Sequence, residues 1–277
     1  MPLIRLEDVE LSYEEHGGGG TVVVSAQMGF TEGRYPSRLA GPPTGYHVYC
    51  LQLRGYGRST HVFEDLGERW YPTWAEDVHR FARALGLPRF VYTGISHGAG
   101  VGWYLALAHP EDLLGFVSVV GGPHDRSGGD TSAARRAQIE AGRDPEKLRQ
   151  ILQRGLPPDA EGDPDAKQRR AALLQRRIDR FLAMSDEELR INPRKPFPEA
   201  RTDAELARRL SQVRVPTLLV AGMRDHIISP EASLRAATSV PGAVAVFFQD
   251  AGHWVAEEHE EEVIAHVKVF VDRLVAG

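Results

Sequence analysis

Apolar residues in this chain gather in short continuous runs, and the segments between the runs have helical spacing. Runs of four to eight β-branched and aromatic residues are typical of parallel strands that are buried on both faces. Six such runs predict strands, at 21–26 (TVVVSA), 47–53 (HVYCLQL), 89–94 (RFVYTG), 115–121 (GFVSVVG), 217–222 (TLLVAG) and 243–249 (AVAVFFQ). Strands that alternate with helices in this way indicate a doubly wound α/β domain.

Several helix ends can be read from the polar residues between these runs. Thr73-Trp-Ala-Glu76 has the form of a capping box, and Gly86 follows the next apolar stripe where a C-terminal glycine is expected. Ser229-Pro230 predicts another helix start. A final helix is predicted from one apolar face, formed by Val263, Ile264, Val267, Phe270, Val271 and Leu274.

The pattern changes between about 125 and 212, where strand-like runs vanish and arginine and alanine become frequent. Two capping boxes, Ser185-x-x-Glu188 and Thr202-x-x-Glu205, indicate helices in this segment. Because the strand-like runs resume near Val215, we predict a helical insertion, or cap, at 125–212 within a core domain formed by 1–124 and 213–277. A helix near 166–182 combines an apolar stripe (Leu174, Ile178, Phe181, Leu182) with basic positions at Lys167, Arg169, Arg170, Arg176, Arg177 and Arg180.

Composition narrows the range of partners. The 277 residues carry a formal net charge of −5, which gives no reason to expect nucleic acid or an anionic membrane as a partner. Cys50 is the only cysteine, so an intramolecular disulfide and a cysteine-based metal cluster are excluded. No apolar stretch approaches the roughly 18 residues of a membrane span, and the N-terminus lacks the apolar core of a signal peptide. We expect a cytoplasmic protein that acts on a small molecule, and a homodimer is left open.

Ser96 lies in the stretch TGISHGAG, with glycines two residues away on either side. With 28 glycines and 13 serines in the chain, about 0.13 such patterns are expected by chance, so the pattern alone decides little. Its position is more informative, because a predicted strand runs directly into a predicted helix at this serine. A serine at that corner would be held in a strained backbone geometry with its hydroxyl above the sheet.

A serine hydroxyl needs a base, and the base needs an orienting group. His253 follows the run AVAVFFQ, and Asp225 follows the run TLLVAG. Loops at the carboxyl ends of parallel strands gather on one edge of the sheet, where ligands bind. These residues therefore predict a nucleophile, base and acid in the chain order Ser, Asp, His. Asp125, after the preceding strand, is a second candidate acid, but it lies where the chain leaves for the cap.

These motifs resemble the α/β-hydrolase superfamily, in the branch with a helical lid between the sixth and seventh strands. The stretches that carry the resemblance are GISHG (94–98), LRGYGRS (53–59), MGF (28–30), GMRD (222–225) and AGHW (251–254). The resemblance implies a mostly parallel eight-stranded sheet flanked by helices. It also implies an oxyanion hole formed by the backbone N–H groups of Phe30 and His97. Two positions depart from the family pattern: Met28 stands where histidine is usual, and Gln52 where aspartate is frequent.

The predicted substrate pocket lies under the cap. Leu173, Leu174 and Phe181 of the cap are candidates for its apolar wall, together with Met28 and Trp254. The side chain of His97 is a rival base, but a residue next to the nucleophile points along the new helix. No histidine or acid cluster shows the sequence spacing of metal ligands, so neither a metal nor a cofactor is predicted.

Three functions agree with these residues. The first is a serine hydrolase that cleaves a small carboxylic ester or lactone through an acyl-enzyme. The second is hydrolysis of a carbon–carbon bond in a diketone-type substrate by the same machinery. The third is a ligand sensor that keeps the three residues but turns over little. A serine at the elbow argues against haloalkane dehalogenase and epoxide hydrolase chemistry, which in this fold resembles attack by an aspartate. Turnover distinguishes a sensor from an enzyme, whose kcat is typically about 1–10³ s⁻¹.

Overall fold

A computed structural model describes residues 1–29, 33–156 and 164–276. Its eight strands form one sheet in the order β1-β2-β4-β3-β5-β6-β7-β8. The pairs from β4 to β8 are parallel, and β1 and β2 join antiparallel at one edge. The strands are β1 (Leu3–Arg5), β2 (Glu10–His16), β3 (Val22–Gln27), β4 (His47–Gln52), β5 (Phe90–Ile95), β6 (Leu113–Val119), β7 (Thr217–Gly222) and β8 (Val244–Phe248).

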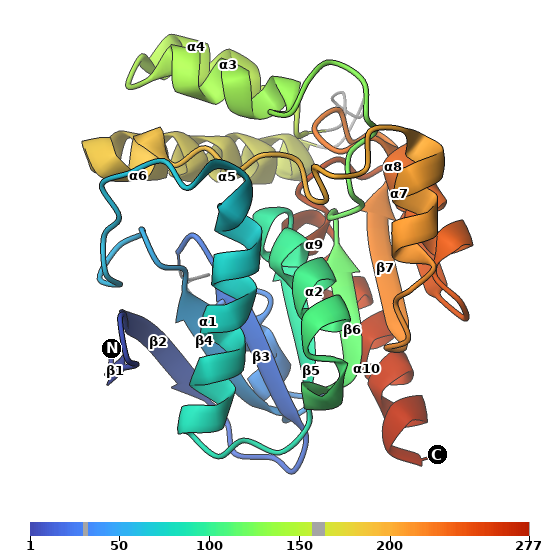
Figure 1. Cartoon of the computed structure of the whole chain (residues 1–277). Coiled ribbons are helices and arrows are strands. Elements are labelled where there is room, and N and C mark those ends of the chain that lie inside the picture. Colours follow the sequence, from blue (N-terminus) through green and yellow to red (C-terminus); the bar gives the residue numbers. More distant parts are fainter. Residues whose placement is uncertain (30–32, 157–163, 277) are drawn as a thin grey trace.

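Helices cover both faces of this sheet, and others lie beyond the carboxyl ends of its strands (Figure 1). The helices are α1 (Trp70–Ala84), α2 (His97–Ala108), α3 (Ala133–Ala141), α4 (Pro145–Gln153), α5 (Pro164–Ala183), α6 (Asp186–Arg190), α7 (Asp203–Leu210), α8 (Pro230–Ser239), α9 (Val255–Glu258) and α10 (Glu260–Ala276). Short 3₁₀ turns are η1 (Ser37–Ala40), η2 (Gly67–Arg69) and η3 (Pro110–Asp112).

Two hydrophobic clusters, one on each face, hold the helices to the sheet. One cluster packs α1, α2, α7 and α8 against the sheet and includes Trp74, Trp103 and Leu206. The other packs η1 and α10 against the opposite face and includes Leu39 and Phe270. Side chains of β3 to β7 are buried on both faces, which explains the continuous apolar runs in the sequence. The predicted eight-stranded, mostly parallel sheet is confirmed.

Two local predictions were wrong. Helix α1 begins at Trp70, directly after η2, so Thr73 lies inside the helix and is not its cap. Burial of Trp70 beside Trp74, with ring centroids 5.0 Å apart, extends the helix beyond the polar signal. The run that forms β8 is not buried on both faces, because β8 is an edge strand and its side chains are half-buried or exposed.

The other predicted helix starts and ends agree with the structure. Gly86 follows α1 with φ of 62°, a conformation that favours glycine. Ser185 and Thr202 each form a complete capping box, at the starts of α6 and α7. The hydroxyl of Ser229 accepts a hydrogen bond from Ala232 N at the start of α8.

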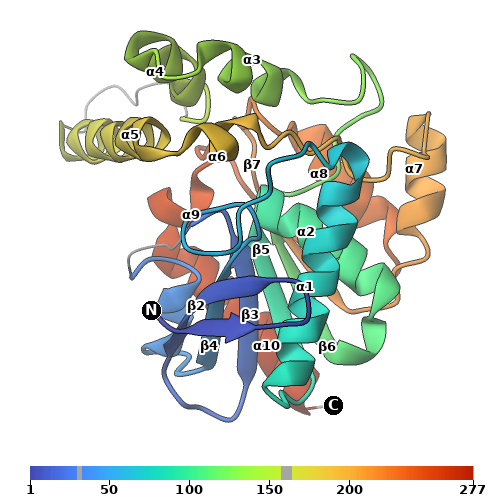
Figure 2. The same ribbon diagram turned by 60° about the vertical axis from the view of Figure 1, so that its left-hand side comes forward.

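The segment between β6 and β7 forms α3 to α7. In Figures 1 and 2, α3 to α6 lie beyond the carboxyl ends of the parallel strands, whereas α7 lies beside α8 at the flank of the sheet. Part of this segment has its own small cluster, in which Leu148, Leu152 and Ile178 pack with Trp254 of the β8–α9 loop. The carboxyl edge of the sheet is therefore covered where the predicted site residues are located. The assignment of 125–212 as a separate cap stays a prediction.

Candidate active site

Ser96 occupies the single residue between β5 and α2, with φ of 52° and ψ of −108°. Its N–H donates to Val119 O at 2.9 Å, and its carbonyl accepts the first helical hydrogen bond, from Gly100 N at 3.0 Å. A positive φ is unusual for serine and indicates stored strain. The surroundings impose it, because β5 is fixed on one side and α2 begins at once on the other.

The glycines on either side of Ser96 are required by close backbone contacts. A Cβ at Gly98 would lie 2.5 Å from Ala26 O and 2.7 Å from Gln27 Nε2. A Cβ at Gly94 would collide with the backbone of Gly98 and Ala99. Both distances at Gly98 are shorter than real Cβ contacts, so the turn needs glycine at these two positions.

His253 and Asp225 come together from neighbouring loops. Asp225 follows β7, His253 follows β8, and His253 Nδ1 lies 2.7 Å from Asp225 Oδ2. Both side chains are buried. Because an ionised carboxylate only accepts hydrogen bonds, Nδ1 carries the proton and Nε2 has the free lone pair. Asp225 Oδ1 accepts from Ile227 N at 2.8 Å and from Ile228 N at 2.9 Å, so the carboxylate is fixed in place.

The same two loops are joined by their backbones. Arg224 N donates to Ala251 O at 3.0 Å, and Met223 N donates to Phe248 O at 2.8 Å. Gly222 ends β7 where a Cβ would collide with the carbonyl oxygens of the β8 loop. These contacts hold the acid and the imidazole in register. In the described part of the chain no hydrogen bond joins Ser96 Oγ to His253, and such bonds commonly tighten only when substrate binds.

His97 follows Ser96, and its side chain is held neutral. Burial, together with the charges of Arg135, His124 and His253, lowers the pKa of His97 to about 3. An imidazole with so low a pKa is a poor proton acceptor, which argues against His97 as the base. Its N–H is at the first position of α2, where amides have no partner within the helix and favour negative charge.

The second predicted oxyanion donor, Phe30, lies outside the described residues, and that prediction stays open. Its neighbour Gly29 faces α5, because a Cβ there would collide with the guanidinium of Arg180. Met28 is half-buried and packs against the cluster that includes Trp74. Met28 and Gly29 therefore lie between the sheet and α5.

The departure at Gln52 has a structural role. Gln52 Oε1 accepts from Arg58 N at 2.9 Å, and its backbone carbonyl accepts from Ser59 Oγ at 2.7 Å. Arg54 of the same loop pairs with buried Asp77 through two hydrogen bonds, of 2.9 and 2.6 Å. Glutamine thus supports the LRGYGRS loop through an amide oxygen.

The segment between β6 and β7 contacts the β8–α9 loop, which carries His253. His253 N donates to Gly155 O at 2.7 Å, just after α4. Trp254 is buried and packs with Leu173 and Leu174 of α5, while half-buried Phe181 packs against this cluster and against the main core. Leu173 and Leu174 thus meet Trp254, but whether these predicted residues line a substrate pocket stays a prediction.

Ion pairs add to this junction. Arg170 Nε lies 3.0 Å from Glu258 Oε1, and Arg177 pairs with Glu257, so α5 is linked to α9. The Arg177 guanidinium also stands over the Trp254 ring, 5.7 Å from its centroid. Burial raises the pKa of Glu258, although Arg170 opposes the shift.

Arg135, in α3, is a buried cation that sequence reasoning missed. It is 4% exposed, and its guanidinium donates to the carbonyls of Leu189 and Ile191. In the described part of the chain Arg135 forms no ion pair, and its Nε has no hydrogen-bond partner. The effect of its charge on the pKa values of His97, Tyr56 and Tyr71 places it in the same region as Ser96. A buried cation without a counter-charge is costly, and it favours a bound anion.

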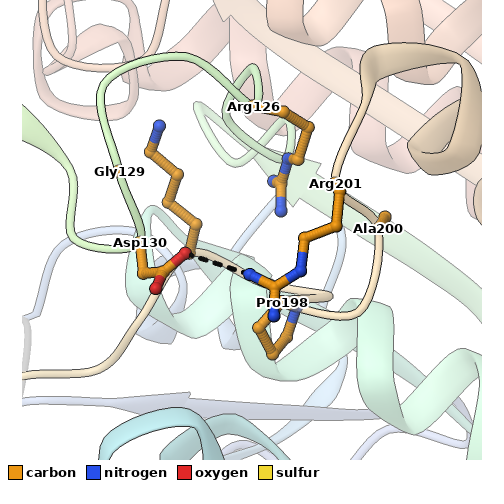
Figure 3. Close-up of a pocket in the computed structure, with 7 residues that line it drawn as sticks. Arg126, Gly129, Asp130, Pro198, Ala200 and Arg201 are labelled. Atoms are coloured by element: carbon orange, nitrogen blue, oxygen red, sulfur yellow. Dashed lines mark ion pairs between the residues drawn. The ribbon is translucent and has the colours of Figure 1, made fainter.

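A cavity of about 110 Å³ lies elsewhere and contains none of the predicted site residues. Its lining residues are Arg126, Gly129, Asp130, Lys195, Pro198, Ala200 and Arg201 (Figure 3). Arg126 donates to the carbonyls of His124, Pro196 and Phe197, and Arg201 pairs with Asp130 at 3.5 Å. Arg126 and Arg201 thus join the stretch after β6 to the stretch before α7. The cavity lies at this junction.

In the described ranges, no helix is long and apolar enough to cross a membrane.

A family model described as the alpha/beta hydrolase fold matches residues 15–260. A relative from Pseudomonas putida, 2-hydroxy-6-oxononadienedioate/2-hydroxy-6-oxononatrienedioate hydrolase 2, is 26% identical over 278 residues, which cover 92% of this chain and 88% of the relative.

Two solved structures are similar in fold. The match to Est816, an N-acyl homoserine lactone degrading enzyme, has a TM-score of 0.74 at 22% identity and spans 97% of this chain and 100% of the Est816 chain. The match to the enol-lactonase from Burkholderia xenovorans has a TM-score of 0.73 at 20% identity and spans 98% of this chain and 100% of the lactonase chain. At these identities the likeness concerns the fold.

Proposed function

Because this chain belongs to the α/β-hydrolase fold family, we propose that it is a serine hydrolase that cleaves a small carboxylic ester or lactone through an acyl-enzyme. The observation that carries the proposal is the buried hydrogen bond of 2.7 Å between His253 and Asp225. It leaves His253 Nε2 as a proton acceptor on the sheet edge where Ser96 stands at a strained turn.

In the first half of the reaction, Ser96 Oγ attacks the carbonyl carbon and His253 Nε2 takes the hydroxyl proton. Asp225 stabilises the imidazolium through the Nδ1 proton. The His97 N–H, with that of Phe30 as the second proposed donor, stabilises the oxyanion. Each such donor is typically worth about 3 kcal/mol in the transition state. When the intermediate collapses, the single bond between the carbonyl carbon and the alcohol oxygen breaks. His253 gives its proton to the departing alcohol oxygen.

The second half repeats these steps with water. His253 Nε2 takes a proton from water, the hydroxide attacks the acyl carbon, and Ser96 leaves with the proton returned by His253. In a lactone the alcohol stays attached to the acyl group, so one hydroxy acid leaves the site. We propose residues 125–212 as the cap over this site, with Leu173, Leu174, Phe181, Met28 and Trp254 as pocket residues.

The nucleophile can be tested by active-site labelling. A fluorophosphonate should modify the chain once, at Ser96, and Ser96→Ala should lose roughly 10⁴–10⁶ in kcat without loss of fold. Ser211→Ala is the matched control, since its hydroxyl only bonds Arg208 O at the exposed end of α7. Labelling at another serine, or near-normal turnover by Ser96→Ala, would reject the proposal. Fewer than a handful of turnovers per wild-type chain would favour a ligand sensor.

Arg135 favours a second candidate, hydrolysis of a carbon–carbon bond in an acidic diketone-type substrate. A buried guanidinium with a free Nε suits a substrate carboxylate. The relative from Pseudomonas putida is named for a dioate substrate. A panel of matched esters, lactones and diketone acids, with intact-mass detection of an acyl-enzyme, separates the two. An acyl-enzyme with an ester supports the first candidate, and turnover of the diketone acids alone supports the second.

A further inference from the structure

A group of metal-ligating side chains lies between α1 and the end of α2, away from Ser96. Glu76 and His79 are three residues apart on α1, which puts them on one face of the helix. His109 directly follows α2. Since α2 has 12 residues, this group lies about 18 Å along the helix from Ser96. Helices α1 and α2 are neighbours in both ribbon views (Figures 1 and 2).

The side chains of this group are already close. One ligand atom each of Glu76, His79 and His109 lies within 4.8 Å of the other two. Glu76 Oε2 and His109 Nε2 are 3.0 Å apart, and the rings of His79 and His109 stack with centroids 3.8 Å apart. Two ligands at 2.0–2.1 Å in a tetrahedral zinc site are about 3.3 Å apart. The two rings are now nearly parallel, 10° apart, so one of them must turn before both in-plane lone pairs point at one ion.

A carboxylate already orients one of the two histidines. His79 Nδ1 lies 2.6 Å from Asp112 Oδ2, in η3, so the carboxylate accepts the Nδ1 proton and Nε2 has the free lone pair. A carboxylate that binds the far nitrogen of a ligating histidine is the usual support of a zinc-bound imidazole. His109 Nδ1 has a weaker partner of this kind, Glu111 Oε1 at 3.6 Å.

Charge around the group favours a cation. Glu76, Glu111 and Asp112 face the two imidazoles. Among the residues that the structure describes, Arg80 is the one guanidinium that pairs with the group, through Glu76 Oε1 at 3.2 Å. Arg80 also pairs with Asp8 at 2.8 Å, so its charge is shared with another carboxylate. The second oxygen of Glu76 remains directed at His109.

We propose that Glu76, His79 and His109 form a binding site for a zinc-type divalent ion, with Asp112 as the positioning residue of His79 and water as the fourth ligand. Two imidazoles and one carboxylate are ligands that suit Zn²⁺. The ion takes the place of the hydrogen bond between Glu76 and His109, and the proton of the neutral His109 imidazole moves to Nδ1, on the side of Glu111. The side chains of Glu76, His79 and His109 are 41%, 23% and 18% exposed, so an ion can reach them.

The ion joins His109, which directly follows α2, to Glu76 and His79 of α1. It binds the folded chain, in which these two separate segments meet, and so it stabilises that state. It lies too far from Ser96 to touch substrate, so the site is structural. Hydrolysis by the EDTA-treated protein should therefore equal that of the zinc-loaded protein at a temperature where both are folded.

Titration of the EDTA-treated full chain with Zn²⁺ tests the site. Calorimetry should give one equivalent bound, and the melting temperature should rise by roughly 5–10 °C at a free Zn²⁺ concentration 100 times Kd. His79→Gln and His109→Gln should each abolish this shift, and Asp112→Asn should weaken binding by about 10–100-fold. His266→Ala, an exposed histidine on α10, is the matched control and should bind as the wild type does.

Co²⁺ provides a second measurement that does not depend on the stability of the variants. Bound in this set, Co²⁺ should give intense visible bands of a tetrahedral site, and Zn²⁺ should displace them. Zn²⁺ binding that is unchanged in the His79→Gln and His109→Gln variants would overturn the proposal. So would a wild-type chain that shows neither a melting shift nor Co²⁺ bands.

Discussion

Asp225 and Asp125 each follow a strand of the parallel sheet, and their carboxylates have different partners. Asp225 binds His253 Nδ1 and two backbone amides of its own loop. Asp125 accepts from Ser127 N at 2.8 Å, and the ammonium of Lys195 binds its backbone carbonyl at 2.9 Å. Asp125 thus bonds within the segment around β6 and α3, and in the described ranges no hydrogen bond or ion pair joins it to His253.

Asparagine substitutions at the two positions should affect kcat very differently. Asp225→Asn should select the wrong imidazole tautomer and lose about 10⁴ in kcat with little change in stability. Asp125→Asn should keep kcat near that of the wild type. The measurements are steady-state kinetics and urea unfolding on both variants. A crippled Asp125→Asn beside an active Asp225→Asn would move the acid to the sixth strand.

Asp125→Asn should also change how stability depends on pH. The hydrogen bond from Ser127, with the charge of Lys195, holds the pKa of Asp125 below its usual value. A carboxyl with a lowered folded pKa stabilises the protein above its unfolded pKa, and this contribution is lost as pH falls through the folded pKa. The destabilisation by Asp125→Asn should therefore be present at neutral pH and disappear in acid.

Among the elements, the turn between β5 and α2 depends most closely on small residues. Gly98→Ala would place a Cβ 2.5 Å from Ala26 O, a backbone atom that cannot move without shifting β3. Alanine gains at most about 1 kcal/mol in helix propensity, whereas overpacking typically costs about 1–3 kcal/mol. We expect Gly98→Ala to be less stable to urea and to react more slowly with a fluorophosphonate.

Gly20→Ala is the control for this substitution. Gly20 has open space where a Cβ would lie and no positive φ. The free energy of unfolding of the Gly20→Ala variant should therefore stay within about 0.5 kcal/mol of that of the wild type. If Gly98→Ala matched Gly20→Ala in both measurements, the turn would be less tightly fitted than these distances indicate.

At the same scale, the sequence predicts buried elements better than exposed or long-range ones. The runs of β3 to β7 were predicted because both faces of these strands are buried, which leaves a continuous apolar signal. Strand β1, with three residues, and β2, which carries Glu10, Glu14, Glu15 and His16, have no such signal and were not found. The start of α1 was misplaced because tryptophan packing, and no polar cap, determines it.

In the candidate site, too, the residues marked by local motifs could be predicted, and those placed by long-range packing could not. Ser96, Asp225 and His253 could be proposed from local motifs, because each directly follows a strand. Arg135 and Gly155 could not, since their roles arise from how the β6–β7 segment folds back on the sheet. The metal-ligand group was missed because Glu76-x-x-His79 is common on helices, and His109 joins it only through the packing of α1 on α2.

Over the whole molecule, charge is divided unevenly between residues 125–212 and the rest of the chain. Residues 125–212 hold 19 of the 33 lysines and arginines and 16 of the 38 acids, so this segment is positive although the chain carries −5. Charge of one sign near a site raises the local concentration of an oppositely charged ligand, and salt screens the effect. The proposed cap should therefore attract acidic substrates.

This charge distribution predicts how rates depend on salt and on Arg135. Between about 0.01 and 0.5 M salt, kcat/KM for an acidic ester should fall several-fold, while that of a neutral ester of the same shape should stay constant. Arg135→Met should raise KM for the acidic ester by about 10–100-fold and leave the neutral ester nearly unchanged, as expected for a lost charge-assisted hydrogen bond. Arg136→Met, the adjacent exposed position of α3, is the control. Equal losses for both esters would assign Arg135 a role in folding alone.

The hydrogen bond from His253 N to Gly155 O would couple access to the proposed site to the position of its imidazole. An outward movement of α4 that admitted a large substrate would draw Gly155 away and remove a backbone anchor of the proposed base. A molecule open in this way would be idle, and its imidazole would recover its position only when α4 returned. Such an interlock would protect the serine from wasteful encounters with molecules that cannot be enclosed. It would also make the size of the substrate, through the time α4 needs to return, a determinant of turnover.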